Sequence, residues 1–382
     1  MARKYSVKLS DTVHRMITIY FVLGLWTTQS GHRTISVSQL FYFVSFCLFG
    51  VSVIIEACTT ENNDDCIFLV VTNLICLVQV GRLYNIIWKQ NRILDLIRTA
   101  SANGTDDYDT FCIVSAKLNK LMSLATYFIF ATLFLLVVVV GLPFIKKELI
   151  FDIAFPLDYK NSESGFYVAY TFVAGIFLLS ITCILFASML WFIMLNFVVK
   201  YEILGNDFKN LGVSGTEEDE QKNTQTLYLQ HLVESIKSLE NINGLLEDFS
   251  SNFSYLFLLQ IVTSSICICG GVYTLAFSSH ANLVQDGFYF TVLFYCFFDT
   301  FTLLYLGNEI MLASDRLSYC LFESEWMEQT QSCKKYFLIV VERLKQPQQL
   351  VVGKLFPMNL RTFTAIVNRA YSLFNVLQNF RE

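Results

Sequence analysis

Charged residues are scarce in this sequence, and their scarcity limits the kind of protein that it encodes. They make up 15% of the 382 residues, against 54% hydrophobic residues. An ordinary soluble domain has about a quarter of its residues charged. The mean hydropathy is also high, at +0.50. Most of the chain is therefore expected to lie in a lipid bilayer.

Basic clusters and histidine-rich sites are also lacking, which argues against nucleic-acid and metal binding. The formal net charge is −5, and no patch of lysines and arginines with interleaved aromatic residues occurs, so nucleic acid is not an expected partner. The four histidines are scattered, and no spacing of Cys or His resembles a zinc site. We therefore expect neither a metal nor a cofactor.

The motifs of enzymes and of many transporters are missing too. No nucleophile or metal constellation of the known enzyme classes occurs. We also find no internal repeat of the kind that marks many secondary transporters. The sequence predicts a protein that is not an enzyme.

Eleven cysteines are present, but they do not form the pattern of a disulfide scaffold. Most lie inside apolar runs, where a thiol behaves as a small hydrophobic side chain. Cys58 and Cys66 differ because they flank a short polar loop, which allows a disulfide between them if the loop is extracellular.

Long apolar runs predict seven transmembrane helices. A helix that crosses a bilayer needs about 20 mostly apolar residues. Six runs meet this requirement, and they cover residues 35–56, 66–88, 122–145, 165–199, 252–278 and 286–307. A seventh, residues 359–380, is less apolar. The expected fold class is an all-α membrane protein.

An earlier apolar run, Met16 to Trp26, is too short to span a bilayer. It is apolar for about eleven residues, and no small-residue cleavage site follows it. We expect an interfacial or re-entrant helix here, neither a signal peptide nor a span.

The distribution of lysine and arginine predicts the orientation. With the N-terminus in the cytoplasm, 21 of these residues fall in cytoplasmic segments and three, Lys146, Lys147 and Lys160, fall in outside loops. Cytoplasmic loops carry the excess of basic residues. After seven spans the C-terminus is therefore extracellular, whereas a G-protein-coupled receptor has the reverse orientation.

The C-terminal part of the chain resembles the insect odorant receptor family. Between about residues 305 and 378 the similar elements are Tyr305-Leu-Gly-Asn-Glu-Ile, Ser314, Tyr319, Trp326, Leu355-Phe-Pro-Met-Asn-Leu-Arg-Thr-Phe363 and Ala370-Tyr-Ser-Leu-Phe374. Gly24-Leu-Trp26 is similar to a motif near the family's N-terminus. Ala370 and Leu377 stand where the related gustatory receptors have Thr and Gln, which favours the odorant branch and, within it, a tuning subunit.

This resemblance implies a function and a division of the chain. The family's tuning subunit binds a small volatile odorant and, with a co-receptor subunit, opens a non-selective cation channel in the plasma membrane of olfactory neurons, as a hetero-oligomer that is expected to be a tetramer. Alternatives are a gustatory-type receptor channel and a G-protein-coupled chemoreceptor. The predicted regions are a cytoplasmic N-terminal segment with an interfacial helix (1–34), six spans forming the odorant-binding domain (35–307), a cytoplasmic anchor for subunit contacts (308–358), and a seventh, pore-lining helix with a short extracellular tail (359–382).

The last helix has one polar face. At about 100° per residue, seven polar side chains fall within an arc of about 120°; they are Thr364, Asn368, Tyr371, Ser372, Asn375, Gln378 and Asn379. An unpaired amide in hydrocarbon is costly, so this face should meet either water or other helices of the same subunit. The resemblance implies that it lines the ion pathway, with Phe374 at the gate and Leu377 and Gln378 on the next turn.

The resemblance also places an odorant pocket in the outer halves of four spans, the second, third, fourth and sixth. These halves are apolar and aromatic with few polar atoms, as a site for volatile organic molecules requires. The candidate ligand-binding residues are Leu69, Val70, Asn73, Phe134, Val137, Gly141, Tyr170, Val173, Ala174, Tyr289, Phe290, Leu293 and Phe294. For each of them, simple packing between helices is the alternative.

Two further features each allow two interpretations. Arg82 and Asp299 lie inside predicted spans, where ionisable residues are functional candidates by default, but a structural ion pair is the alternative. Between Cys333 and Leu344, apolar residues recur at helical spacing. That stripe indicates either a contact between subunits or packing within one subunit.

Overall fold

The protein is almost entirely helical. The computed structural model describes residues 5–7, 11–27, 36–61, 63–105, 107–147, 149–150, 152–212, 221–277 and 283–379. Within these residues lie ten α-helices: α1 (Asp11–Val22), α2 (Val37–Thr59), α3 (Asn63–Trp88), α4 (Gln90–Ser101), α5 (Tyr108–Lys146), α6 (Glu163–Lys209), α7 (Gln221–Phe277), α8 (Leu283–Phe322), α9 (Gln331–Leu344) and α10 (Leu360–Asn379). A 3-10 turn, Trp326–Glu328, precedes α9.

Two small antiparallel ribbons complete the described structure. One pairs β1 (Tyr5–Val7) with β2 (Asn103–Thr105), and the other pairs β3 (Val351–Val352) with β4 (Phe356–Pro357). The first ties the N-terminal segment to the chain that follows α4, and the second lies directly before α10.

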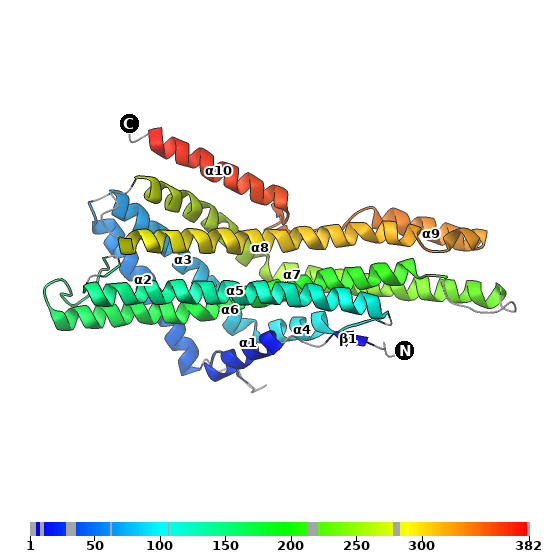
Figure 1. Ribbon diagram of the computed structural model, residues 1–382, viewed down its shortest axis with the longest axis horizontal. Helices are drawn as coiled ribbons and strands as arrows, with labels where there is room; N and C mark the ends of the chain where they lie inside the picture. Colours follow the sequence, from blue (N-terminus) through cyan, green and yellow to red (C-terminus); the bar gives the residue numbers. More distant parts are fainter. Residues whose placement is uncertain are drawn as a thin grey trace.

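The helices form one elongated bundle (Figure 1). α5, α6, α7 and α8 run along its length, α2 and α3 lie in its left half, and α9 packs beside α8 in its right half. The C-terminal end of α5 and the N-terminal end of α6 meet at the left end, opposite α9. One half of the bundle is therefore built from many helices and the other half from extensions of a few.

Six helices are long and apolar enough to cross a bilayer: α2, α3, α5, α6, α7 and α8. They contain the six strongly apolar runs of the sequence. α10, which contains the seventh predicted span, falls short of the same hydropathy requirement because one of its faces is polar.

Several helices continue well beyond the predicted spans. α7 begins at Gln221, whereas the apolar run begins at residue 252. Buried residues of this extension, such as Tyr228, Leu232, Leu239 and Leu246, recur at helical spacing. Hydropathy therefore located only the part of α7 that suits a bilayer. The preceding part of the helix is amphipathic, with one buried face.

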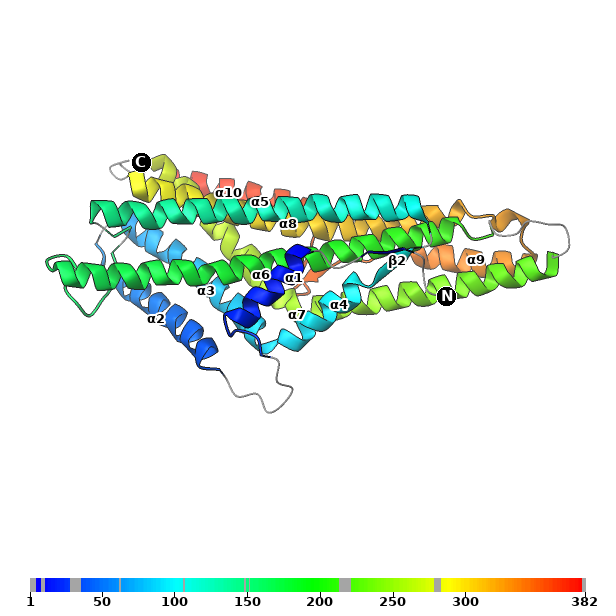
Figure 2. The same ribbon diagram turned by 60° about the horizontal axis from the view of Figure 1, so that its bottom comes forward.

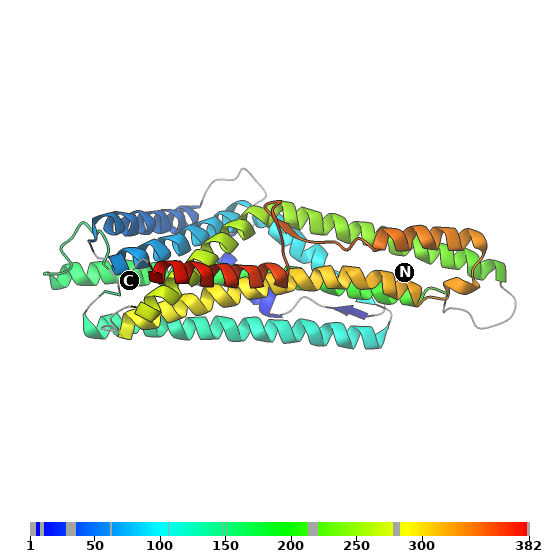
Figure 3. The same cartoon turned by 90° about the horizontal axis from the view of Figure 1, so that it is seen from above.

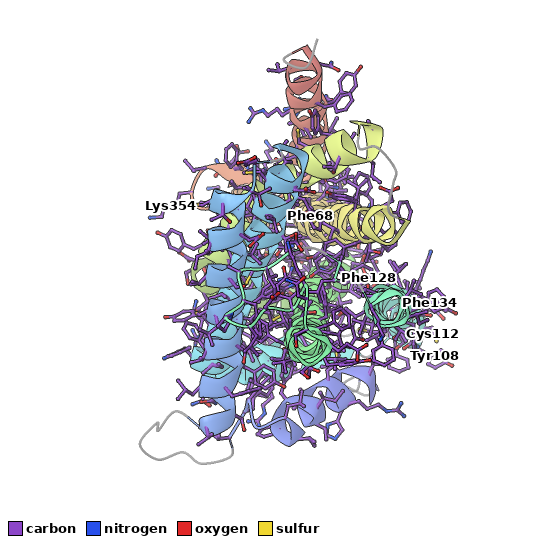
Figure 4. All side chains as sticks on the ribbon, turned by 90° about the vertical axis from the view of Figure 1, so that its left-hand side faces the viewer. Phe68, Tyr108, Cys112, Phe128, Phe134 and Lys354 are labelled. Atoms are coloured by element: carbon purple, nitrogen blue, oxygen red, sulfur yellow. The ribbon has the colours of Figure 1, made fainter. Side chains whose placement is uncertain are left out.

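α6 is the central helix of the bundle. Every residue from Thr182 to Val199 is buried, which is the pattern of a helix that is surrounded on all sides. It packs chiefly on α8 and also on α5 and α7. Viewed along the long axis, α6 lies between α3, α5 and α8 (Figure 4).

The N-terminal helix α1 lies against α6 and ends at Val22, earlier than the apolar run Met16 to Trp26 suggested (Figure 2). The reason is the turn at Gly24, whose φ is +69°, a conformation that favours glycine. The turn directs Trp26 into the core, where its indole Nε1 donates to the carbonyl of Ile86 at 3.0 Å. The Gly24-Leu-Trp26 motif therefore closes the N-terminal segment onto α3.

The stretch between α8 and α10 is held closely against α8. A Cβ at Gly307 would lie 2.6 Å from the carbonyl oxygen of Met358, so only glycine permits this approach. The backbone N–H of Gln348 donates to Ser314 Oγ at 3.1 Å. Gly307 and Ser314, two conspicuous residues of the C-terminal pattern, thus fix the point at which α10 begins.

The apolar stripe of α9 packs mostly within its own subunit. Phe337, Val341 and Leu344 are buried, and Phe337 stacks on Trp326 with ring centroids 4.5 Å apart. Tyr336, from the same predicted stripe, is exposed. The packing interpretation therefore holds for the buried residues, and the exposed side of α9 is not part of that contact.

Candidate functional site

A cavity of about 120 Å³ lies among α2, α3, α5, α6 and α8. Its lining residues are Phe46, Phe49, Thr72, Ile75, Cys76, Gln79, Thr132, Leu136, Ile176, Phe177, Ser180, Ile184, Phe288, Thr291, Val292 and Tyr295. Most of these side chains are apolar or aromatic. An apolar cavity of about 150 Å³ holds a benzene-sized molecule, so this one suits a small organic ligand.

Aromatic rings pack closely around the cavity. Phe288 lies edge-on to Phe68 at 5.5 Å and to Phe177 at 5.8 Å, and Tyr295 stacks on Phe128 at 5.8 Å. Phe68 and Phe128 both lie in the interior between the helices in Figure 4. Such ring pairs each add about 0.5–1.5 kcal/mol beyond burial, which stiffens the walls.

The polar side chains of the cavity fall into two groups. Thr132, Ser180 and Thr291 each donate to a backbone carbonyl of their own helix, at 2.6 to 2.8 Å. Thr72 Oγ1 and Gln79 Oε1 are buried without a hydrogen-bond partner among the described residues. These two atoms on α3 are available to a ligand.

A buried ion pair lies at the inner end of the cavity. Arg82 Nη2 donates to Asp299 Oδ2, and Arg82 Nη1 donates to the hydroxyl of Tyr295. Arg82 and Asp299 are almost completely buried, at 1% and 2% exposure. Gln79 and Tyr295 line both the main cavity and a smaller one of about 20 Å³ beside this pair. The two ionisable residues singled out in the spans are thus each other's partners.

The segment between α5 and α6 lies at the outer end of this region. Ser52 of α2 donates to the carbonyl of Ala154 at 2.8 Å and accepts the Ala154 N–H through its own carbonyl at 3.4 Å. Phe155 packs on Phe172, which in turn packs on the cavity residue Phe49, with centroids 5.9 and 6.3 Å apart. The segment is thereby connected to the cavity wall through a row of rings.

Tyr159 stabilises the same segment. The backbone N–H of Ile153 donates to the Tyr159 hydroxyl at 3.2 Å, and that hydroxyl donates to Asp152 at 3.1 Å. Burial raises the pKa of Tyr159 to about 12. Lys160 donates to the other oxygen of Asp152 at 2.8 Å, and this hydrogen bond raises the pKa of Lys160. Tyr159 and Lys160 therefore both keep their protons throughout the neutral range.

None of the thirteen predicted ligand-binding residues lines the cavity. Five are exposed on the outside of the bundle: Val70, Phe134, Val137, Phe290 and Phe294. Figure 4 shows Phe134 on the outer side of α5. Leu69 and Tyr289 are buried in helix packing, and Tyr170, Val173 and Ala174 line a separate gap of about 10 Å³ between α5 and α6.

The other three predicted residues lie at helix contacts or in open space. Asn73 Oδ1 is 3.4 Å from the Cβ position of Gly50, and Leu293 is 3.7 Å from that of Gly271. A Cβ at Gly141 would meet nothing within 4 Å. The sequence identified four of the five helices that form the cavity, missed α2, and selected other faces of those four helices than the ones that line it. The role of these thirteen residues in binding stays a prediction.

Two of the residues that line the cavity could have been identified from the sequence. Thr72 and Gln79 are polar residues inside an apolar span and lie seven positions apart, on the same face of α3. Polar residues within spans usually face the interior of a bundle. This spacing could have located the cavity face of α3, but no comparable signal marks Phe46 or Phe49 of α2.

α10 packs on α7 and α8 at the edge of the bundle (Figure 3). Ile366 and Ala370 are buried, and Phe363 contacts Phe297 and Phe301 of α8 with centroids 5.3 and 5.2 Å apart. Four polar residues of the predicted polar face are among the exposed ones: Thr364, Asn368, Tyr371 and Ser372. These four polar side chains do not pack within their own subunit.

The predicted gate residues lie near the end of α10. Phe374 and Asn375 are half-buried, between the packed and the exposed faces, whereas Tyr371 is exposed. The side chains of Leu377 and Gln378 lie outside the described residues. The arrangement leaves the polar face free to meet water or another subunit.

Cys58 and Cys66 are both free thiols in the structure. The Cys66 thiol donates to the carbonyl of Ala57 at 3.5 Å, so it has a partner other than Cys58. The disulfide that the polar loop allowed is therefore not formed here. In the described part of the chain, no group of three His, Cys, Asp or Glu side chains is arranged to hold a metal ion.

The model of the family described as 7tm Odorant receptor matches residues 62–371 of this chain. That range contains α3 to α9 and more than half of α10, so the match includes the start of the polar face and every cavity residue except Phe46 and Phe49 of α2.

Curated relatives show the same similarity over shorter lengths. Odorant receptor 23a of Drosophila melanogaster is 30% identical over 153 residues, which are 39% of this chain and 39% of the relative. Putative odorant receptor 92a of the same organism is 22% identical over 240 residues, 60% of this chain and 54% of the relative. The chain thus spans between about two fifths and a half of the length of these relatives.

Solved structures share the fold of the whole chain. The insect olfactory receptor OR5 from Machilis hrabei has a TM-score of 0.82 at 15% identity, covering 96% of this chain and 99% of that one. Its complex with eugenol has a TM-score of 0.80 at 14% identity, covering 96% and 97%. The seven-helix arrangement, with α10 as the seventh, is therefore that of an insect olfactory receptor.

Proposed function

The chain belongs to the 7tm odorant receptor family of insects, and from that membership we propose that it is a subunit that binds a small volatile odorant and, with a co-receptor, opens a cation channel. The observation that carries the proposal is the small, largely apolar cavity among α2, α3, α5, α6 and α8. Such a cavity matches the size and polarity of a volatile organic molecule.

The cavity supports weak, reversible binding. Burying roughly 250 Å² of an odorant at about 25 cal/mol per Å² contributes about 6 kcal/mol before the cost of ordering the ligand. Affinities in the micromolar range or weaker follow from that figure. A sensor that must release its ligand quickly suits this range.

α8 supplies a physical connection between the cavity and α10. Its residues Thr291, Val292 and Tyr295 line the cavity, and Phe297 and Phe301 on another face contact Phe363 of α10. A ligand that binds better when α8 is displaced shifts the population toward that state, and α10 moves with it. We assign the gate to Phe374, on the α10 turn that carries Tyr371 and Asn375.

The exposed polar face of α10 supports a pore shared between subunits. Amide and hydroxyl groups are costly in contact with hydrocarbon, so this face requires water or polar partners. Several copies of α10 around one axis provide both. Leu377 gives this chain an apolar side chain on the turn after the proposed gate, so in a mixed tetramer the co-receptor helices supply most of the ion selectivity.

The test is whole-cell current in cells that express this chain with and without the co-receptor, during application of a diverse odorant panel with G-protein signalling blocked. Rapid cation current only in the co-expressing cells supports the proposal. A response abolished by the block, or obtained without any cation current, contradicts it.

The same recordings test the gate. Phe374→Ala is expected to raise the ligand-free current, because a large apolar side chain is removed from the pathway. Unchanged ligand-free and odorant-evoked currents in this variant would contradict the assignment of Phe374.

A further inference from the structure

The polar atoms of the cavity are separated along α3. With a rise of about 1.5 Å per residue, Thr72 and Gln79 lie about 10 Å apart along the helix axis. The side-chain oxygens Thr72 Oγ1 and Gln79 Oε1 are both buried without a hydrogen-bond partner among the described residues. Buried polar atoms in native proteins are normally paired, so each one indicates a place where a ligand can complete the hydrogen bonding.

Gln79 is the more informative of the two because Tyr295 lies at the same level. Both residues line the main cavity, and both also line the smaller cavity beside Arg82 and Asp299. Tyr295 and Gln79 therefore form the inner end of the ligand cavity, whereas Thr72 lies toward its outer end.

The hydroxyl of Tyr295 is already used as an acceptor. It accepts a hydrogen bond from Arg82 Nη1, and a guanidinium group only donates. The phenolic proton is not used in this bond, so it remains available to an acceptor in the cavity. The inner end thus offers one acceptor, Gln79 Oε1, and one donor, the Tyr295 O–H.

We propose that the ligand is a volatile alcohol or phenol whose hydroxyl group donates to Gln79 Oε1 and accepts from the Tyr295 hydroxyl. This inference rests on the proposed odorant-binding function and names its ligand class. A hydroxyl is the smallest group that both donates and accepts. An ether, ester or ketone only accepts and leaves Gln79 Oε1 unpaired, and a hydrocarbon leaves both groups unpaired.

The size and shape of the cavity complete the description of the ligand. A volume of about 120 Å³ extending over about two helical turns of α3 fits a slender molecule of roughly six to nine non-hydrogen atoms. Its apolar part lies against Phe46, Phe49 and Phe288, and its polar end lies near Arg82. The hydroxyls of Thr132, Ser180 and Thr291 are paired with backbone and do not compete for it.

The test measures binding to the purified full-length chain by the shift in its thermal unfolding as a function of probe concentration. Two sets of probes are matched in size: hexan-1-ol, hexanal, 1-methoxypentane and heptane, and benzyl alcohol, benzaldehyde, anisole and ethylbenzene. In at least one set the alcohol is expected to bind roughly ten- to a hundredfold more tightly than the ether, because the ether leaves a buried acceptor unpaired.

Substitutions at Gln79 and Thr72 locate the interaction, and one at Thr300 serves as a control. Gln79→Leu is expected to reduce the preference for the alcohol over the ether to less than about threefold. Gln79→Met, with an unbranched side chain, serves if the leucine variant does not fold. Thr72→Val is expected to retain the preference, because it changes the outer end. Thr300→Val removes a buried, unpaired hydroxyl of α8 that does not line the cavity, and it controls for general effects of such a loss.

The outcomes distinguish a failure of the proposed odorant binding from a failure of the proposed ligand class. If no probe of either set stabilises the natural chain, odorant binding in this cavity is contradicted, and the ligand class with it. If ethers and hydrocarbons bind as well as alcohols, the ligand class is wrong while the binding function stands. If Thr72→Val removes the preference and Gln79→Leu retains it, the hydroxyl does not bind at the inner end, and the proposal is overturned.

Discussion

At the scale of single residues, the pair formed by Arg82 and Asp299 has the largest energetic consequence. Both side chains are removed from water and lipid, and each has the other as its charged partner. Taking a charge out of water costs several kcal/mol, and only a close partner compensates for it. Arg82 in addition holds the Tyr295 hydroxyl of the cavity. The pair therefore stabilises the fold and orients a cavity side chain together.

Asp299→Asn is expected to destabilise the protein by about 3–5 kcal/mol, because it leaves the Arg82 charge buried without a counterion. Thermal unfolding of the purified chain should show a midpoint lower by about 5 °C or more. The double variant Arg82→Met with Asp299→Leu should recover most of this loss, since it removes both charges.

The matched control is Lys160→Met, which breaks the exposed ion pair with Asp152, whose side chains are 60% and 52% accessible. Surface pairs contribute less than about 1 kcal/mol. If Asp299→Asn and Lys160→Met lowered the midpoint equally, the buried pair would not have the stabilising role assigned to it.

At the scale of elements, α8 contacts both the cavity and α10, the helix on which we propose the gate. One of its faces lines the cavity, and another contacts α10 through Phe297 and Phe301, which both pack on Phe363. α10 packs on both α7 and α8, and of these two helices only α8 lines the main cavity. Coupling between the cavity and α10 should therefore depend on this ring contact.

Phe363→Ala is expected to weaken that coupling without changing ligand binding. Two ring contacts of about 0.5–1.5 kcal/mol each are lost, so the odorant concentration for half-maximal current should rise about tenfold. The thermal stabilisation by the same odorant should stay unchanged, because Phe363 does not line the cavity.

Phe130→Ala provides the comparison, because Phe130 is an exposed aromatic residue of α5 that contacts neither the cavity nor α10 in the described structure. It should leave both measurements unaltered. A loss of odorant binding in Phe363→Ala, or an equal rise in the half-maximal concentration in Phe130→Ala, would argue against transmission through this contact.

The same elements show how far the sequence could predict the site. The order and positions of six apolar spans were confirmed because hydropathy depends only on the type of residue and the length of the run. The faces of the helices were not predictable in the same way. In a bilayer the lipid-facing side is as apolar as the core side, so Val70 is exposed and its neighbour Leu69 is buried with no difference in polarity.

α10 was predictable for the opposite reason. Its two faces differ in polarity, so the helical period alone separated Asn368 and Ser372 from Ile366 and Ala370. The long cytoplasmic extension of α7 also has a stripe at helical spacing, but an apolar-run criterion does not detect it. The cavity required knowledge of how five helices pack, which no single segment contains.

At the scale of the whole molecule, the elongated shape places α9 at one end and α2 and α3, which line the cavity, toward the other (Figure 1). The excess of lysine and arginine lies in the segments at the α9 end and in the N-terminal part, which predicts that these face the cytoplasm. In that predicted orientation the cavity lies in the extracellular half of the bundle.

A short tag at the N-terminus is therefore expected to stain only after cells are permeabilised, whereas a tag at the C-terminus should stain in intact cells. The two tagged proteins are compared at equal surface expression, measured by surface biotinylation. Staining of the N-terminal tag in intact cells would reverse the orientation and favour a G-protein-coupled receptor.

The complete enclosure of α6 from Thr182 to Val199 separates this stretch from the bilayer, whereas the other spans and the outer part of α6, with Val168 and Leu178 exposed, meet it. A bilayer of different thickness or lipid composition acts directly on exposed helices such as α2 and α5, whose tilt adjusts to mismatch. The enclosed stretch of α6 is displaced only when the helices packed around it move. Tilting of the exposed helices relative to the enclosed stretch of α6 should therefore change the shape of the cavity. If odorants bind there as proposed, the odorant sensitivity of the receptor should vary with the membrane in which it is measured.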